Sequence, residues 1–128
     1  MIWLAVAIGG ALGALARFSV GYWLQPISST EPNIIQFPIA TLFVNCLGAF
    51  FIGFVFAYFL DQSQPSPFWR SLIITGFLGS LTTFSTFSLE IMTLIERGAW
   101  SMAVAYFGLS VLGCVVLTFV GFSLYRWI

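Results

Sequence analysis

The segment from Thr75 to Glu90, TGFLGSLTTFSTFSLE, holds the side chains best suited to contact an ion. Phe84 and Phe87 are three residues apart, so they share one face of a helix. The edge of a phenylalanine ring is partly positive and attracts a small anion, and neighbouring hydroxyl groups can donate hydrogen bonds to it. Most phenylalanine pairs of this kind serve packing alone. Here five hydroxyl residues surround the pair and favour an anion site: Thr82, Thr83, Ser85, Thr86 and Ser88.

Two further segments carry polar side chains at helical spacing. Asn45 follows Thr41 by one turn on the same face. An asparagine in such an apolar segment either bonds to a neighbouring helix or faces a polar pathway. Closer to the C-terminus, four residues recur at every fourth position and line one helix face. A packed interface is the alternative, but four in register favour a polar track: Tyr106, Ser110, Cys114 and Thr118.

Two charged residues stand inside apolar segments. Arg17 either extends its side chain to the membrane surface or forms a vestibule charge that attracts anions. Glu90 either pairs with an arginine or faces a water-filled mouth. The chain has no histidine, and both its cysteines, Cys46 and Cys114, lie in apolar segments. Neither a disulfide framework nor a cysteine–histidine metal site is indicated, and each thiol is interpreted as buried and inert.

The composition defines the elements that must position these side chains. Of 128 residues, 60% are hydrophobic and 6% are charged, whereas soluble domains carry about a quarter charged residues. We therefore expect an all-α integral membrane protein. Its continuous apolar runs argue against a β-barrel, and the first lacks the basic start and cleavage site of a signal peptide. A bilayer core needs about 20 helical residues per crossing, which predicts one domain of four spans: 2–24, 35–60, 68–95 and 99–127.

The connectors between these spans contain helix breakers. They read QPISSTEPN, DQSQPSP and ERGA, with Gly98 in the last. A break is also expected within the third span, near the bilayer midplane. Gly76 and Gly79 weaken that helix, and the hydroxyls from Ser80 to Thr83 can replace lost backbone bonds. Freed carbonyls would suit a cation, and the N-terminus of the second half-helix would suit an anion. The alternative is a merely kinked helix.

The arginines give almost no orientation signal. Arg70 and Arg126 lie towards one side of the membrane, and Arg17 and Arg97 towards the other. Insertion in both orientations would permit an antiparallel homodimer, and four short helices can hardly enclose a polar pathway alone. Small residues at four-residue spacing support close helix contacts: Gly9 with Gly13, Gly10 with Ala14, and Ala49 with Gly53.

The run GFLGSLTTFSTFSLE, with GGALGALARF and TLFVN, resembles the signature of the fluoride channel family Fluc, also called CrcB. The resemblance covers all four spans. It implies an antiparallel homodimer in the inner or plasma membrane, with two fluoride pathways through which fluoride leaves the cytoplasm passively. Two residues depart from the family pattern: Ser80 replaces a glycine, and Cys114 stands where serine, a stronger hydrogen-bonding group, is more usual.

The resemblance also implies a role for individual residues. Phe84 and Phe87 would contact fluoride, and Asn45 would face the pathway. Gly79 and Thr82 would offer backbone carbonyls to a structural sodium ion shared by the two subunits. Arg17 and Glu90 would lie in the vestibule. The remaining pathway residues would be Thr41, Thr83, Ser85, Thr86, Ser88, Tyr106, Ser110, Cys114 and Thr118.

Other functions fit the sequence less well. A small proton-coupled multidrug exporter also has four spans, but that family carries a carboxylate in the first span, where this chain has Arg17. A purely structural subunit would leave the broken helix and the polar track unexplained. No nucleophile–base pair or metal cluster suggests an enzyme, and no nucleic-acid partner is expected.

Overall fold

The computed structural model describes residues 1–24 and 35–128, and most of these residues form helices. Three continuous helices, α1 (Ile2–Leu24), α2 (Ile39–Asp61) and α6 (Trp100–Trp127), accompany a segmented helix from Pro67 to Glu96. Each of the four is long and apolar enough to cross a membrane. The prediction of an all-α, multi-pass membrane protein is therefore confirmed. The first predicted connector, QPISSTEPN, lies outside the described residues.

The predicted boundaries are close, and the largest error is at the start of the second span. Residues 35–38 are not helical and α2 begins at Ile39, because the residue before Pro38 is biased away from helical backbone. The turn predicted at Gly98 is present. Gly98 has φ of 74°, and its N–H donates to Ile95 while that of Ala99 donates to Leu94. This paired pattern closes the C-terminus of a helix around a left-handed glycine.

The third segment changes character along its length. After α3 (Pro67–Arg70) it widens into the π-helical η2 (Ser71–Leu78), and it returns to α-helix in α4 (Gly79–Leu81). Thr82 and Thr83 then adopt extended backbone, with ψ of 156° and 123°, before α5 (Phe84–Glu96) begins. The helix is thus interrupted at Thr82–Thr83. The glycines lie in and just after the π-helical part, where the backbone is wider but still wound.

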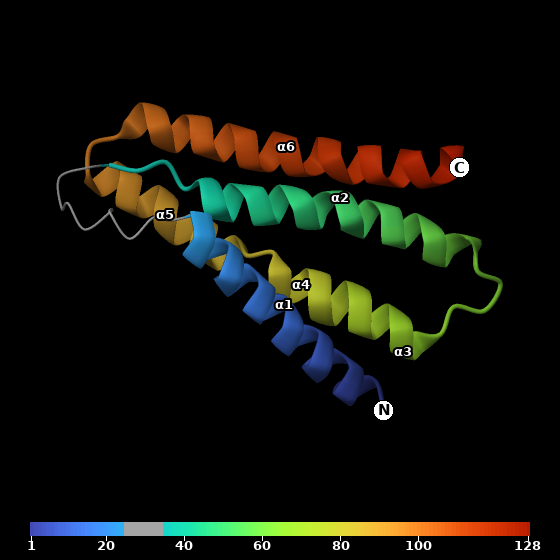
Figure 1. Ribbon diagram of the computed structural model, residues 1–128. Coiled ribbons are helices and arrows are strands. Elements are labelled where there is room, and N and C mark those ends of the chain that lie inside the picture. The colour runs from blue at the N-terminus through green and yellow to red at the C-terminus, as the bar shows by residue number, and fades with distance from the viewer. Residues whose placement is uncertain (25–34) are drawn as a thin grey trace.

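The helices pack as two closely joined pairs. Figure 1 shows α2 and α6 side by side and running in the same direction, with α1 crossing the α3–α4 half of the third segment. Glycines allow both contacts. A Cβ at Gly9 or Gly13 would collide with backbone of the third segment, and one at Gly53 or Gly121 would collide with backbone across the α2–α6 interface. The predicted small-residue motifs therefore serve packing within one chain.

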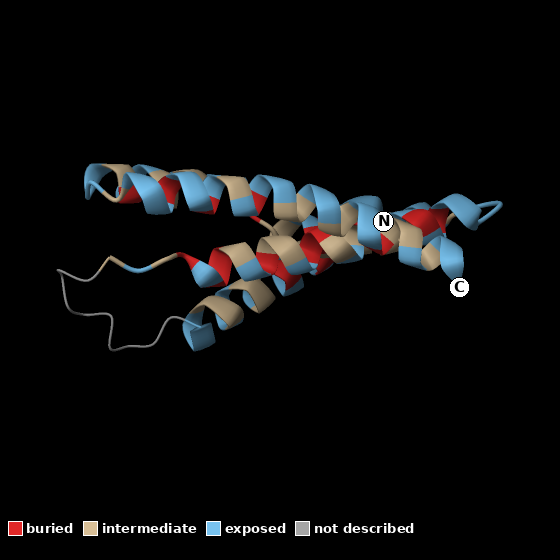
Figure 2. Ribbon diagram, turned by 90° about the horizontal axis from the view of Figure 1, so that it is seen from above, coloured by how far each residue is buried: buried red, intermediate tan, exposed pale blue. Residues whose placement is uncertain are grey.

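The buried residues form a narrow strip between these helices, and most of the outer surface is exposed (Figure 2). One buried cluster contains Phe87, Leu94, Ala103 and Tyr106. Large apolar side chains such as Phe119 and Leu112 point outward instead. An apolar exterior around a small core is the arrangement expected for a chain surrounded by lipid.

The α2–α6 contact generates a stability prediction. Gly121→Ala would press a methyl group against the Phe50 carbonyl, and overpacking of this kind costs about 1–3 kcal/mol of unfolding free energy. Gly108→Ala in the same helix is the matched control, because nothing lies within 4 Å of its added Cβ. Unfolding followed by circular dichroism in mixed micelles measures both. Equal stability of the two variants would contradict the close approach.

Candidate functional site

The interruption of the third segment is held by a side chain from α2. The Nδ2 group of Asn45 donates to the carbonyl of Thr83 at 3.1 Å, and the N–H of Thr83 donates to Oδ1 of Asn45 at 2.8 Å. In a continuous helix that N–H would donate to the carbonyl of Gly79. The Asn45 amide therefore replaces backbone partners that the interruption removes, as the sequence predicted for an interhelical asparagine.

The hydroxyl group of Thr83 starts α5. Its Oγ1 accepts a hydrogen bond from the N–H of Thr86 at 3.2 Å, and it lies 3.3 Å and 3.1 Å from the hydroxyl oxygens of Ser85 and Thr86. Threonine is a favoured N-cap because its oxygen satisfies an N–H at the open end of a helix. Since Thr86 N–H is used here, the Thr82 carbonyl also lacks the donor that a continuous helix would give it.

A cavity of about 400 Å³ lies beside this junction, between α2, α5 and α6. We call it the central pocket. It collects polar side chains and rings that are far apart in the sequence. Among its lining residues are seven of the predicted pathway residues: Asn45, Thr83, Phe84, Phe87, Ser110, Cys114 and Thr118.

The two phenylalanines both line the central pocket, as their spacing predicted, but their surroundings differ. Their ring centroids are 5.5 Å apart. Phe87 is only 4% exposed and packs edge-on against Tyr106 at 5.1 Å, so it also belongs to the core. Phe84 is 77% exposed. In this chain Phe84 therefore contributes little packing, and a purely structural explanation accounts for Phe87 better than for Phe84.

The hydroxyl of Ser110 is the free polar group of the central pocket. Ser110 is 5% exposed, and within the described residues its Oγ is buried without a hydrogen-bond partner. An unpaired buried hydroxyl costs about 1–3 kcal/mol, so a ligand that accepts from it would recover that energy. The hydroxyls of Thr118 and Ser88 are already used, because they donate to the carbonyls of Cys114 and Phe84, each at 2.9 Å.

Tyr106 and Thr41 surround a different group. The Thr41 hydroxyl donates to Oε1 of Glu90 at 2.7 Å, and the Tyr106 hydroxyl donates to Oε2 at 2.6 Å. From the sequence we expected Glu90 either to pair with an arginine or to face a water-filled mouth. The structure shows two hydroxyl donors that the sequence analysis did not predict. The predicted track along α6 therefore divides. Ser110, Cys114 and Thr118 line the central pocket, whereas Tyr106 donates a hydrogen bond to Glu90.

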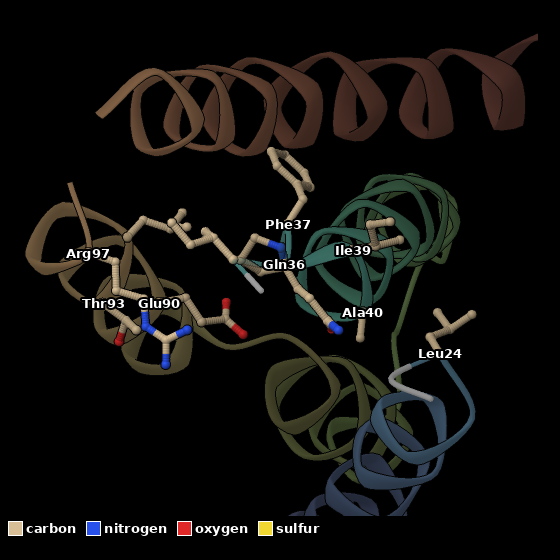
Figure 3. A pocket seen from close by; sticks show the side chains of 11 residues that line it. Leu24, Gln36, Phe37, Ile39, Ala40, Glu90, Thr93 and Arg97 are labelled. Atoms are coloured by element: carbon tan, nitrogen blue, oxygen red, sulfur yellow. The ribbon is translucent and has the colours of Figure 1, made fainter. Parts of the chain in front are cut away.

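Glu90 also lines a second cavity of about 410 Å³ at one end of the bundle, the outer pocket. Figure 3 shows its polar side chains: Glu90 and Thr93 from α5, Arg97 directly after α5, and Gln36 from the segment before α2. Sequence reasoning did not place Arg97 here. Its signal was the spacing from Glu90, seven residues or two helical turns along the same face. Arg17, the predicted vestibule cation, is partly buried on α1 and lines neither pocket.

Comparison of the sequence with known proteins identifies the family of this chain. Residues 4–122 match the family described as "CrcB-like protein, Camphor Resistance (CrcB)". The chain belongs to the CrcB-like family. It is 46% identical to a protein of Sulfurovum sp. (strain NBC37-1) over 96% of this chain and 92% of that one. It is 42% identical to a protein of Acinetobacter baumannii over 98% and 94%. Both are named "Fluoride-specific ion channel FluC".

A relative from Saccharophagus degradans carries the same name and is 47% identical over 83% of this chain and 75% of its own length. These names describe channels and not enzymes, in agreement with the sequence analysis. The CrcB-like match extends from α1 into α6. It therefore includes the interruption, both pockets and every candidate site residue.

The Asn45–Thr83 pair generates a prediction about stability. Asn45→Ala would leave the N–H and carbonyl of Thr83 without partners, at a cost of about 1–3 kcal/mol of unfolding free energy. Ser19→Ala is the control, because it removes an exposed hydroxyl that only donates to Leu15 within α1; such changes usually stay within about 0.5 kcal/mol. The same unfolding assay applies. An Asn45→Ala protein as stable as the control would show that the amide does not hold the interruption.

Proposed function

We propose that this chain forms a fluoride-selective channel of the inner or plasma membrane, through which fluoride leaves the cytoplasm down its gradient. The names of the relatives support fluoride as the ion. The observation that carries the proposal is the central pocket, where the unpartnered Ser110 hydroxyl, two phenylalanine rings and the N-terminus of α5 come together. Each of these groups favours a small anion.

The chemistry of fluoride explains why such weak groups are suitable. Hydrogen fluoride is a weak acid that crosses membranes uncharged and dissociates at cytoplasmic pH, which traps the anion inside. Because fluoride is small and strongly hydrated, a pore must replace its water with several donors without holding the ion too tightly. Ser110 is a free donor in the pocket. Asn45 instead acts by positioning, because its amide is bonded to the backbone of Thr83.

The alternative, a proton-coupled multidrug exporter, is less consistent with the structure. It would need a carboxylate in the first span, and α1 contains none. The embedded carboxylate of this chain is Glu90, whose two oxygens accept hydrogen bonds from Thr41 and Tyr106.

Fluoride efflux from liposomes that contain only this protein tests the proposal. Liposomes loaded with potassium fluoride should release it to a fluoride electrode when an ionophore balances the charge. Matched liposomes loaded with chloride should retain their anion. Equal release of both anions, or no release above that of protein-free liposomes, would contradict a fluoride-selective channel.

The exposed ring of Phe84 allows recognition to be separated from stability. Phe84→Ile should leave the chain folded by circular dichroism and slow fluoride efflux about two- to tenfold, because the aliphatic side chain lacks a positive ring edge worth about 0.5–1.5 kcal/mol. Phe18→Ile is the matched control, since Phe18 is also an exposed phenylalanine, at 72%. Efflux at the wild-type rate through the Phe84 variant would show that this ring does not contribute to fluoride recognition.

The proposal includes an antiparallel homodimer with two pathways. At the interruption, Gly79, Phe84, Ser85 and Thr86 are exposed on the single chain. Irregular backbone and hydroxyl groups of this kind are tolerated at membrane depth only when protein or a cavity covers them. A second copy would cover them, and the even division of the four arginines supports insertion of that copy in the opposite orientation.

Labelling of the second connector tests the orientation. Ser63→Cys in a chain with both native cysteines changed to serine places one exposed thiol between α2 and α3. In sealed vesicles, an impermeant maleimide should label about half of the copies, and the rest only after permeabilisation. Labelling of all or none of the copies before permeabilisation would establish a single orientation.

A structural sodium ion at the dimer interface is also part of the proposal. Main-chain oxygens would be its ligands, because hard cations prefer oxygen. The carbonyls of Gly79 and Thr82 fit this role. Their helical donors, the N–H groups of Thr83 and Thr86, are bonded to Asn45 and to the Thr83 hydroxyl. A bound sodium ion would supply positive charge that offsets these carbonyl dipoles.

Removal of sodium tests this part. Dimers in detergent should dissociate when N-methylglucamine replaces sodium, because carbonyls from two subunits would then face each other without a cation. Gly79→Ala should weaken the dimer in sodium, although its Cβ would come no closer than 3.4 Å to other atoms of its own chain. Light scattering measures both. Dimers of equal stability with and without sodium would exclude a structural role for the ion.

A further inference from the structure

The two thiols of the chain meet across the α2–α6 interface. Cys46 and Cys114 are its only cysteines, and both are partly buried and unbridged. The sulfur of Cys46 reaches α6, where it would lie 3.6 Å from a Cβ placed at Gly113. Cys114 follows Gly113 directly in α6, so the two cysteines lie beside each other across the interface. A pair of facing thiols was not expected from the sequence, which suggested two separate, inert cysteines.

The register of the two helices explains why these thiols meet. Because α2 and α6 run in the same direction (Figure 1), residues in contact keep a nearly constant separation in sequence. Gly53 contacts Thr118 and Phe50 contacts Gly121, separations of 65 and 71 residues. Cys46 and Cys114 are 68 residues apart, midway between these values. The glycine contacts that fix the helix pair therefore also fix the thiol pair.

We propose that Cys46 and Cys114 form a two-coordinate site for a thiophilic metal ion, best suited to Hg²⁺. Soft thiolate ligands select soft metal ions, and mercury(II) binds two thiolates in a line. Side chains in contact across an interface lie about 4 Å apart, a span comparable to two metal–thiolate bonds of roughly 2.3 Å each. Zinc requires four ligands, and no third or fourth cysteine or histidine exists in the chain.

Charge balance favours the divalent metal ion over monovalent silver or copper. Mercuric chloride enters as a neutral molecule. Two mercury–chlorine and two S–H bonds break, two mercury–sulfur bonds form, and two protons and two chlorides leave without any oxidation or reduction. The product is neutral, whereas a monovalent ion bound to two thiolates would leave a negative charge in an apolar interface. Burial of such a charge is costly.

The site would also affect the central pocket. Cys114 lines that pocket with Ser110 and Thr118, so a metal on its sulfur would occupy or narrow the space proposed for fluoride. This second consequence depends on the proposed function, whereas metal binding itself does not. Cys114 would then make the channel sensitive to mercury.

Intact-mass measurement of the detergent-solubilised protein tests the site. One equivalent of mercuric chloride should add one mercury and remove two protons per chain. The metal should survive glutathione at a concentration roughly a hundredfold above that which strips it from Cys46→Ser or Cys114→Ser, because two linked ligands act together. Serine keeps the size of cysteine, and circular dichroism confirms that each variant is folded. Binding of two mercury ions per chain, or equal resistance of wild type and variants, would overturn the site.

Fluoride efflux from metal-free and mercury-loaded liposomes separates the two proposals. We expect metal-free protein to conduct, mercury-loaded wild type to lose most of its efflux, and Cys46→Ser, whose changed residue does not line the central pocket, to conduct after mercury and a glutathione wash. Full efflux with mercury bound would place the metal outside the pathway and overturn the second consequence alone. Absence of efflux from metal-free protein would contradict the proposed channel and leave the mass measurement of the metal site intact.

Discussion

The reciprocal hydrogen bonds between Asn45 and Thr83 are the constraint on which the rest of this structure depends. A polypeptide in lipid cannot leave its main-chain groups unpaired, so the third segment could not stop at Leu81 and restart at Phe84 without a partner from elsewhere. One amide from α2 supplies both a donor and an acceptor. Because Thr83 is held in place, its own hydroxyl can cap α5, and α5 then directs Phe87 and Glu90 towards α6.

This arrangement separates two kinds of polar group. In the central pocket, Ser110 keeps a free hydroxyl and the other polar side chains are mostly bonded to backbone. Around Glu90, both carboxyl oxygens have hydroxyl donors, so this group is hydrogen-bonded within the chain before any ion arrives. The buried ring of Phe87, which contacts Tyr106, lies between the two regions. A change at Phe87 is therefore expected to alter both.

The sequence was sufficient for what depends on local chemistry. Apolar run lengths predicted four helices, Gly98 predicted the turn before α6, and alternating hydroxyls near glycines predicted an interruption. The exact place of the interruption was less accessible: the glycines and hydroxyl residues indicated residues 76–83, and Asn45 selects Thr83 within that range. Partners across helices were not predictable either, because no periodicity shows that Tyr106 reaches Glu90 or that Cys46 meets Cys114. The seven-residue spacing of Glu90 and Arg97 is a signal in the sequence that predicts their shared helix face and hence their shared pocket.

The pairing of α2 with α6 also has a consequence for biogenesis. The glycine contacts at Gly53 and Gly121 join two helices that leave the ribosome far apart in time. Until α6 has been synthesised, α2 has no partner for this face and must wait in the bilayer, or within the insertion machinery, while α3 to α5 are added. Thr83 arrives before α6 does, so the Asn45 amide can be satisfied first. Assembly should therefore proceed from the interruption outward, and the central pocket closes only when the last helix docks.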